Sequence, residues 1–162
     1  MMTTSIGTSN TFNAYIDGAC SHNPGRGGWA AVIRSDRLKV DISGKKDLTT
    51  NNEMELLAAL RALENITGFA EWRKIENIYI NIYSDSAYIV NSVNQKWIDK
   101  WNKNNWKTVK QQDVSHSEIW KRIYFYLIQN DKYKIKFIKV KGHSNVELNE
   151  LADQLAKDRI RK

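Results

Sequence analysis

Residues 49–83 read TTNNEMELLAALRALENITGFAEWRKIENIYINIY, and this stretch decides the fold. Its opening Thr and Asn residues offer N-cap side chains, and the apolar residues that follow recur at helical spacing, with Leu56 and Leu60 on one face. Ile78–Tyr83 then alternates apolar and polar residues, as a half-buried strand does. Because a strand–helix–strand passage of this length returns to a parallel strand, we expect a parallel crossover in an α/β sheet.

Three strands are predicted upstream of this passage. Phe12–Asp17 alternates apolar and polar residues, and the turn-forming residues of His22–Gly28 separate it from Trp29–Arg34 and Leu38–Ser43. The connections are short, so the three strands are expected to form an antiparallel meander. Residues 1–10 are polar and are expected to be a disordered lead-in.

Downstream, the pattern predicts three more helices, one more strand and a segment rich in Lys and Trp. These are the helix Ser86–Val93, the basic segment Lys96–Lys110, the helix Ser117–Gln129, the strand Ile135–Val140 and the helix Glu147–Arg159. The expected fold is a single α/β domain over residues 11–162. Its sheet has five mixed strands, three antiparallel then two parallel, with helices on both faces. Sites in such sheets form at the carboxyl ends of the parallel strands.

Charge and cysteine content narrow the class of protein. Lys and Arg outnumber Asp and Glu by 25 to 18 among the 162 residues, which favours a polyanionic partner. A single cysteine, Cys20, excludes an intramolecular disulfide framework. The sequence has no apolar run of the ~20 residues that a membrane helix needs, and no signal-peptide core. We therefore expect a cytoplasmic monomer without a membrane or an obligate protein partner.

Four carboxylates lie where the predicted elements could bring them together. Asp17 and Asp85 end the first and fourth strands, Glu55 lies in the first turn of a helix, and Asp153 lies in the last helix. Singly, Glu55 could favour the helix dipole and Asp85 could cap a helix. As a cluster they would repel one another, so divalent cations are expected to neutralise them, and hard cations such as Mg²⁺ prefer oxygen ligands.

Four motifs occur in order along the chain and carry a resemblance to a known family. They are Asp17-Gly18-Ala19-Cys20 with Asn23-Pro24-Gly25 and Gly27-Gly28-Trp29, Thr49-Thr50-Asn51-Asn52-Glu53-Met54-Glu55-Leu56, Tyr83-Ser84-Asp85-Ser86 with Tyr88, and Lys141-Gly142-His143 with Asn149-Glu150 and Ala152-Asp153. Together they resemble the motifs of the type 1 ribonuclease H family. The resemblance implies a ribonuclease H-like fold and an endonuclease that cuts the RNA strand of RNA–DNA hybrids, leaving 5′-phosphate and 3′-hydroxyl ends.

The resemblance also implies roles for single residues. Asp17, Glu55, Asp85 and Asp153 match the metal ligands, and His143 matches a histidine that assists proton transfer or product release. Contacts with the substrate backbone are implied for four more residues in the first two motifs: Asn23, Asn51 and Asn52 near the RNA 2′-hydroxyls, and Thr50 in a phosphate pocket for the DNA strand. Turn and cap chemistry is the alternative reading of these four, and both readings can hold together.

The basic segment resembles the family's protrusion that grips the DNA strand, since positive side chains neutralise phosphates and aromatic faces pack on sugars or bases. The residues expected to contact nucleic acid are Lys100, Trp101, Lys103, Trp106 and Lys107. Trp106 and Lys107 are favoured as contacts, whereas Trp97 is at least as well explained by packing against the body. Departures from the family pattern are Glu53, where relatives often carry a basic residue, and Asn105 and Asn145, where glycine is common.

The expected mechanism uses two Mg²⁺ ions, with Mn²⁺ as a substitute. Asp17 bridges both ions. Asp85 and Asp153 hold the ion that activates water, and Glu55 holds the ion that stabilises the leaving 3′ oxygen. Two other readings stay open. One is a nuclease of the same fold that acts on DNA, and the other is a catalytically silent module that binds hybrids.

Overall fold

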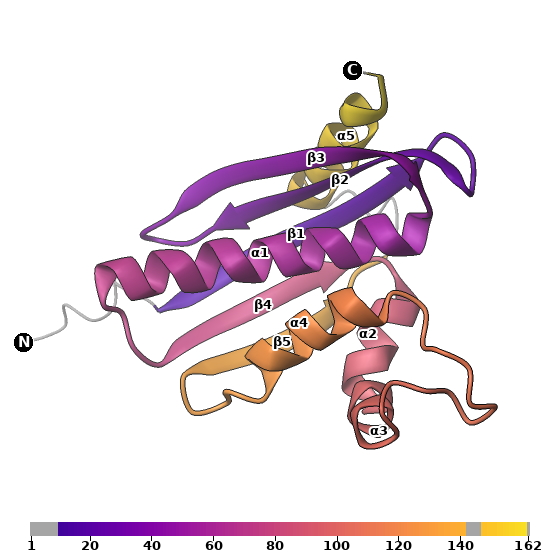
Figure 1. Cartoon of the computed structure of the whole chain (residues 1–162). Helices are drawn as coiled ribbons and strands as arrows, with labels where there is room; N and C mark the ends of the chain where they lie inside the picture. Colours follow the sequence, from indigo (N-terminus) through magenta and orange to yellow (C-terminus); the bar gives the residue numbers. More distant parts are fainter. Residues whose placement is uncertain (1–9, 142–146, 162) are drawn as a thin grey trace, which may run out of the picture.

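The computed structural model describes residues 10–141 and 147–161, which form five strands and five helices (Figure 1). In chain order the elements are β1 Thr11–Cys20, β2 Gly25–Arg34, β3 Lys39–Thr49, α1 Asn51–Arg73, β4 Ile78–Ser84, α2 Ala87–Asn94, α3 Trp97–Lys103, α4 Ser117–Leu127, β5 Tyr133–Lys139 and α5 Glu147–Arg161. The predicted strands and helices are confirmed in type and order, and α3 is an additional short helix inside the basic segment. None of the helices in this described part is long and apolar enough to cross a membrane.

The sheet has the predicted mixed topology, with the strand order β3-β2-β1-β4-β5. β1 pairs antiparallel with β2, and β2 pairs antiparallel with β3. On its other side β1 pairs parallel with β4, and β4 pairs parallel with β5. Figure 1 shows α1 and α4 on one face of this sheet and α5 on the other, so both faces carry helices.

The main core lies between the sheet and α1. Phe12 and Ile16 of β1 and Ile80 of β4 are fully buried on this side, against a helix whose buried stripe includes Leu56 and Leu63. The Thr50 hydroxyl accepts a hydrogen bond from the Glu53 main-chain N–H at 3.1 Å and so caps the helix, as predicted. The left-handed residue Lys74 (φ 56°) ends it.

The first strands are longer than the apolar pattern predicted. β2 begins at Gly25 instead of Trp29, and β3 continues to Thr49 through Lys45 and Lys46. Main-chain hydrogen bonding extends both strands beyond the apolar residues, since ladder pairing needs no apolar side chain. The turn predicted at residues 22–28 is correspondingly shorter.

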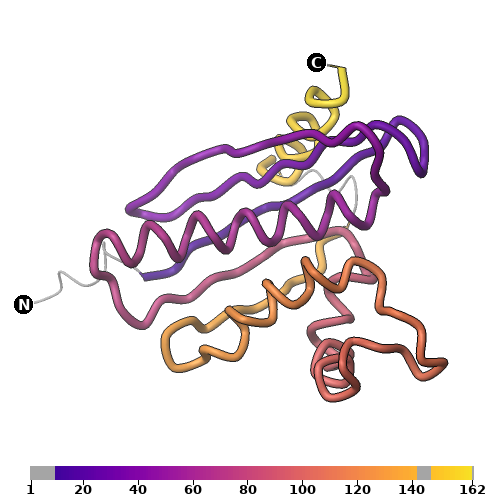
Figure 2. Tube along the Cα trace, in the orientation of Figure 1, coloured from indigo at the N-terminus to yellow at the C-terminus, as the bar shows by residue number. Residues whose placement is uncertain are grey.

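The chain between α2 and α4 projects away from the body, as the trace in Figure 2 shows. It contains α3 and a loop in which Lys107 forms an isolated antiparallel bridge with Asp113. Asn105 has a positive φ of 53°, a left-handed geometry that Asn tolerates better than most residues other than glycine.

Candidate active site

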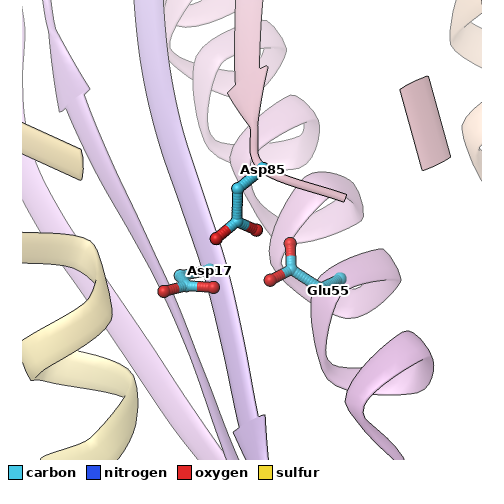
Figure 3. Close-up of side chains that lie close together, drawn as sticks. All are labelled: Asp17, Glu55 and Asp85. Atoms are coloured by element: carbon cyan, nitrogen blue, oxygen red, sulfur yellow. The ribbon is translucent and has the colours of Figure 1, made fainter. Parts of the chain in front are cut away.

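Three carboxylates from three different elements point toward one another at one end of the sheet (Figure 3). Asp17 comes from β1, Glu55 from the first turns of α1, and Asp85 from the residue after β4. Each offers an oxygen atom, and these atoms all lie within 4.8 Å of one another. The parallel pairing of β1 with β4 produces the convergence, because it brings both carboxyl ends to the same edge.

Gly18 sets the distance between β1 and α1. A Cβ atom at this position would lie 2.6 Å from the main-chain nitrogen of Glu55, so only glycine allows the helix to approach this closely. The Gly18 N–H donates to Asp17 Oδ1 at 2.9 Å and to Glu55 Oε1 at 2.8 Å. The Ser84 hydroxyl donates to the other carboxylate oxygen of Glu55 at 3.3 Å. Both carboxylates are therefore oriented before any ligand arrives.

The fourth carboxylate, Asp153, reaches the same cavity from α5. A Cβ atom on Gly28 would lie 2.2 Å from the carbonyl oxygen of Ala156, so glycine again allows a helix to sit directly on the sheet. Asp153 pairs with Lys157 at 3.0 Å, and both line a cavity of about 410 Å³ together with the other three acids. The structure thus brings together all four acids that the sequence singled out.

Burial and mutual repulsion disfavour full ionisation of this cluster. Burial, and after it the carboxylates of Asp153 and Asp85, raise the pKa of Asp17 to about 6, against the opposing effect of its hydrogen bond with Glu55. Burial also raises the pKa of Glu55 well above its ordinary value, with added contributions from Asp17 and Asp85. A divalent cation would remove this electrostatic cost, since it favours the charged form of every carboxylate around it.

The donor set fits a hard divalent cation. The four acids offer only oxygen atoms, which suits Mg²⁺, Mn²⁺ or Ca²⁺ better than softer metals. Asn149, only 5% exposed, lines the same cavity, and its Oδ1 is buried without a hydrogen-bond partner in the described structure. No sequence motif assigns Asn149 a role of its own. An uncommitted amide oxygen beside four carboxylates adds to an environment that suits a hydrated cation.

Comparison with known proteins agrees with this geometry. The family model for RNase H matches residues 9–161. The chain belongs to the RNase H family. It is 44% identical over 148 residues to the ribonuclease H of Caldanaerobacter subterraneus subsp. tengcongensis, covering 91% of this chain and 90% of that protein. It is 42% identical over 147 residues to the ribonuclease H of Caldicellulosiruptor saccharolyticus, covering 91% and 94%.

Solved structures share the fold at lower identity. The crystal structure of LC11-RNase H1 in complex with an RNA/DNA hybrid superposes with a TM-score of 0.69. Its sequence is 22% identical to this RNase H, and the match covers 93% of this chain and 96% of that one. The likeness supports the topology that positions the four acids.

A second cavity of about 440 Å³ lies beside the first, at the start of α1. Its walls contain all four residues that the resemblance linked to the substrate backbone, and three more that it did not: Asn23, Thr50, Asn51, Asn52, Tyr88, Ser115 and His116. Asn23 Oδ1 accepts from the Asn51 main-chain N–H at 3.1 Å, which ties the β1–β2 turn to the helix. The sequence assigned His116 no role, because no local motif marks a residue that reaches the cavity from the start of α4.

Glu53 carries a negative charge near this second cavity, but the charge is compensated. Lys46 Nζ donates to its carboxylate at 2.8 Å, and the Thr49 hydroxyl donates at 2.5 Å. Burial alone would raise the pKa of Glu53. These two hydrogen bonds, with the positive charges of Lys46 and His116, outweigh burial and lower it. Lys46 therefore supplies, from β3, a positive charge beside Glu53.

Two tryptophans of the basic segment, Trp97 and Trp106, do not lie where the sequence predicted. Trp106 is 9% exposed and packs edge-on against Tyr124, so it belongs to the core and not to a contact surface. Trp97, for which packing against the body was at least as good an interpretation as nucleic-acid contact, is partly exposed. It lines a groove of about 280 Å³. Trp101 lines the same groove and packs against Trp120, with ring centroids 5.7 Å apart.

The lysines of the basic segment differ in their surroundings. Lys100 and Lys103 are exposed, and Lys100 lines the groove. Lys107 also lines it and forms an ion pair with Asp113. His143 and the departure at Asn145 lie outside the described residues.

Proposed function

We propose that this RNase H is an endonuclease that hydrolyses the RNA strand of RNA–DNA hybrids with the help of divalent cations. The convergence of Asp17, Glu55 and Asp85 within 4.8 Å carries the proposal, with Asp153 lining the same cavity. Relatives that share 42–44% identity over nearly their whole length are named ribonuclease H. LC11-RNase H1, which shares the fold, has been crystallised with an RNA/DNA hybrid.

We propose Mg²⁺ as the cation, bound as a pair, with Mn²⁺ as a substitute. Bound cations of this kind supply an activated water and stabilise charge on the leaving oxygen of a phosphodiester. The four carboxylates would hold them, with Asp17 at the centre because it interacts with each of the other three acids. His143 is proposed to assist proton transfer or product release. Products are expected to carry 5′-phosphate and 3′-hydroxyl ends.

The protein groups around the carboxylates supply orientation. The Gly18 N–H holds an oxygen of both Asp17 and Glu55, so neither carboxylate has to be ordered when substrate binds. Such pre-organisation lowers the reorganisation cost of catalysis. Both side chains are buried apart from the atoms that line the cavity, which limits their other conformations.

Hybrid recognition is proposed to use the second cavity and the basic segment. Thr50 and His116 would bind a phosphate of the DNA strand. Asn23, Asn51 and Asn52 would lie near the RNA 2′-hydroxyls. Contacts to hydroxyls of one strand and to the backbone of the other would separate a hybrid from either pure duplex.

Further along the DNA strand, the groove of the basic segment is proposed to add phosphate and sugar contacts. Lys100, Trp101 and Lys107 of the groove would make them, together with Trp97 in place of Trp106. The exposed Lys103 of α3 would add a further phosphate contact outside the groove. The enzyme is proposed to act as a monomer. A cytoplasmic location is proposed because hybrids form where DNA is copied and transcribed.

Charge-neutral substitutions test the catalytic assignment. Asp17→Asn and Glu55→Gln should abolish cleavage of a hybrid and leave most of its binding, because they remove charge without removing bulk. The matched control is Asp158→Asn on α5, whose carboxylate accepts from Gln154 and does not line the cavity. Full cleavage by the Asp17 variant would overturn the proposal.

A further inference from the structure

One part of the sheet has a face that no described helix covers. α5 packs on β1, β2 and β3, whereas the same face of β4 and β5 lies beyond it (Figure 1). Phe12 of β1 contacts Phe69 of α1, so the residues between the buried apolar positions of β1 point to the opposite side. The strand registers place nine residues on this open sheet face: Thr11, Asn13, Tyr15, Tyr79, Asn81, Tyr83, Lys134, Lys136 and Ile138.

The open sheet face is organised in three rows that cross β1, β4 and β5. The first row pairs Thr11 with Tyr79 and Lys134, and Tyr79 is 50% exposed. In the middle row the Asn81 amide donates to Asn13 Oδ1 at 3.0 Å, beside the exposed Lys136.

The third row holds an aromatic pair. The rings of Tyr15 and Tyr83 stack with centroids 4.6 Å apart and planes 9° apart, and Ile138 lies beside Tyr83. Both tyrosines stay partly exposed. Aromatic rings, amides and ammonium groups thus share one continuous surface.

The charge of this surface favours an anionic partner. None of its nine residues is acidic, while Lys134 and Lys136 are exposed and form no ion pair within the described ranges. Lys134 donates to the carbonyl of Asn130, which keeps its ammonium group at the sheet edge. Aromatic rings on a sheet with flanking positive charge form the usual platform for unpaired bases.

The surface is also continuous with the active site. Tyr15 lies two residues before Asp17 on β1, and Tyr83 lies two residues before Asp85 at the end of β4. Two residues of strand span about 7 Å, so the stacked tyrosines occupy the row next to the catalytic carboxylates. A strand that leaves the active site in this direction would meet the tyrosine pair first, then Lys136 in the middle row and Lys134 with Tyr79 in the first row.

We propose that the open sheet face binds single-stranded nucleic acid that extends from the hybrid beyond the active site. The inference rests on the proposed function. Bases would stack on Tyr79 and make edge-to-face contacts with the Tyr15–Tyr83 pair, and phosphates would lie against Lys134 and Lys136. The plain alternative is that the two lysines only discourage edge-to-edge pairing of β5, which would give no binding.

Binding is best measured with the inactive Asp17→Asn protein, by fluorescence anisotropy. The probes are a blunt RNA–DNA hybrid and the same hybrid with a single-stranded extension of about eight nucleotides, within the ~4–16 nucleotides that small sheet folds bind. Extensions of RNA and of DNA at either end are compared. We expect one of them to tighten binding at least about fivefold over the blunt hybrid.

Variants of the open sheet face identify the residues responsible. Lys134→Glu with Lys136→Glu should return the ratio of the two affinities to near one and lower the salt slope for the extended probe by about 1.4, two lysines at ~0.7 each. The matched control reverses two exposed charges at the opposite edge of the sheet, Arg37→Glu with Lys39→Glu, and should keep the ratio. Tyr79→Ala should lower the ratio and Tyr79→Phe should restore it.

Several results would overturn the proposal. They are an extension that adds no affinity, an equal loss in the control pair, or sedimentation that shows two copies joined through this face. Cleavage of the blunt hybrid by the wild-type enzyme is measured in parallel. If that cleavage is present and the extension has no effect, only the sheet-face proposal fails; if it is absent, the proposed function fails.

Discussion

Removing the charge of Asp17 should stabilise the metal-free protein at neutral pH. Asp17 is 6% exposed, and its pKa is raised from an ordinary value near 3.8 to about 6. The native state therefore holds this proton more tightly than the unfolded state does. The stability that this tighter proton binding contributes is fully present below pH 4 and is lost as pH rises through about 6. A pKa difference of about 2 corresponds to about 3 kcal/mol at pH 7.5.

Asp17→Asn avoids this loss, because an amide is neutral at every pH in this range. With chelator at pH 7.5, urea unfolding should give the variant up to about 3 kcal/mol more unfolding free energy than the wild type. For a protein of this size that is roughly 6–12 °C in Tm. At pH 4 the difference should shrink to near zero, since the wild-type carboxyl is then mostly protonated in the native state.

Added Mg²⁺ should reduce the difference in unfolding free energy between the variant and the wild type at pH 7.5, because it binds the native wild type and stabilises it by mass action. Asp158→Asn, which changes a half-exposed carboxylate of α5, should show neither the gain nor its pH dependence. An Asp17 variant that is less stable than the wild type at pH 7.5 would refute the electrostatic account. A gain of the same size at pH 4 and pH 7.5 would refute it equally.

Three further substitutions follow from the contacts. Gly18→Ala should reduce cleavage on the order of 100-fold and lower stability by about 1–3 kcal/mol, because its Cβ would lie 2.6 Å from the main chain of Glu55; kinetics and urea unfolding check both. Lys46→Ala should raise KM about fivefold, the equivalent of ~1 kcal/mol for an exposed charge interaction, and adding Glu53→Gln should reverse it; unchanged KM would contradict the compensation. Trp106→Ala should cost about 3–5 kcal/mol, as a buried aromatic does, which thermal unfolding measures.

Periodicity predicted the sheet because each strand alternates or is uniformly apolar, and because the α1 passage requires a parallel crossover. The position of the acids followed from the same topology, since Asp17 and Asp85 end parallel neighbours. Strand ends were less predictable. Gly25 to Gly28 and the lysines of β3 extend the ladder through main-chain bonds, which leave no apolar signature.

Residues that act from distant parts of the chain were the hardest to predict. His116 reaches the second cavity from the start of α4, and only the three-dimensional structure brings it to Thr50. Helical spacing could not predict which of Trp97 and Trp106 is buried in the core. The left-handed main chain at Asn105 and Trp106 turns the second indole into the core. Nothing in the local sequence specifies that direction.

The four carboxylates are expected to cut RNA only when it is paired with DNA. The direct measurement follows one end-labelled RNA strand, alone, paired with RNA and paired with DNA, each with Mg²⁺ and with chelator. Cleavage of the DNA-paired sample alone, only with Mg²⁺ and with 3′-hydroxyl products, is the expected result. Cleavage of the RNA duplex, cleavage in chelator, or tight hybrid binding without cleavage would contradict it.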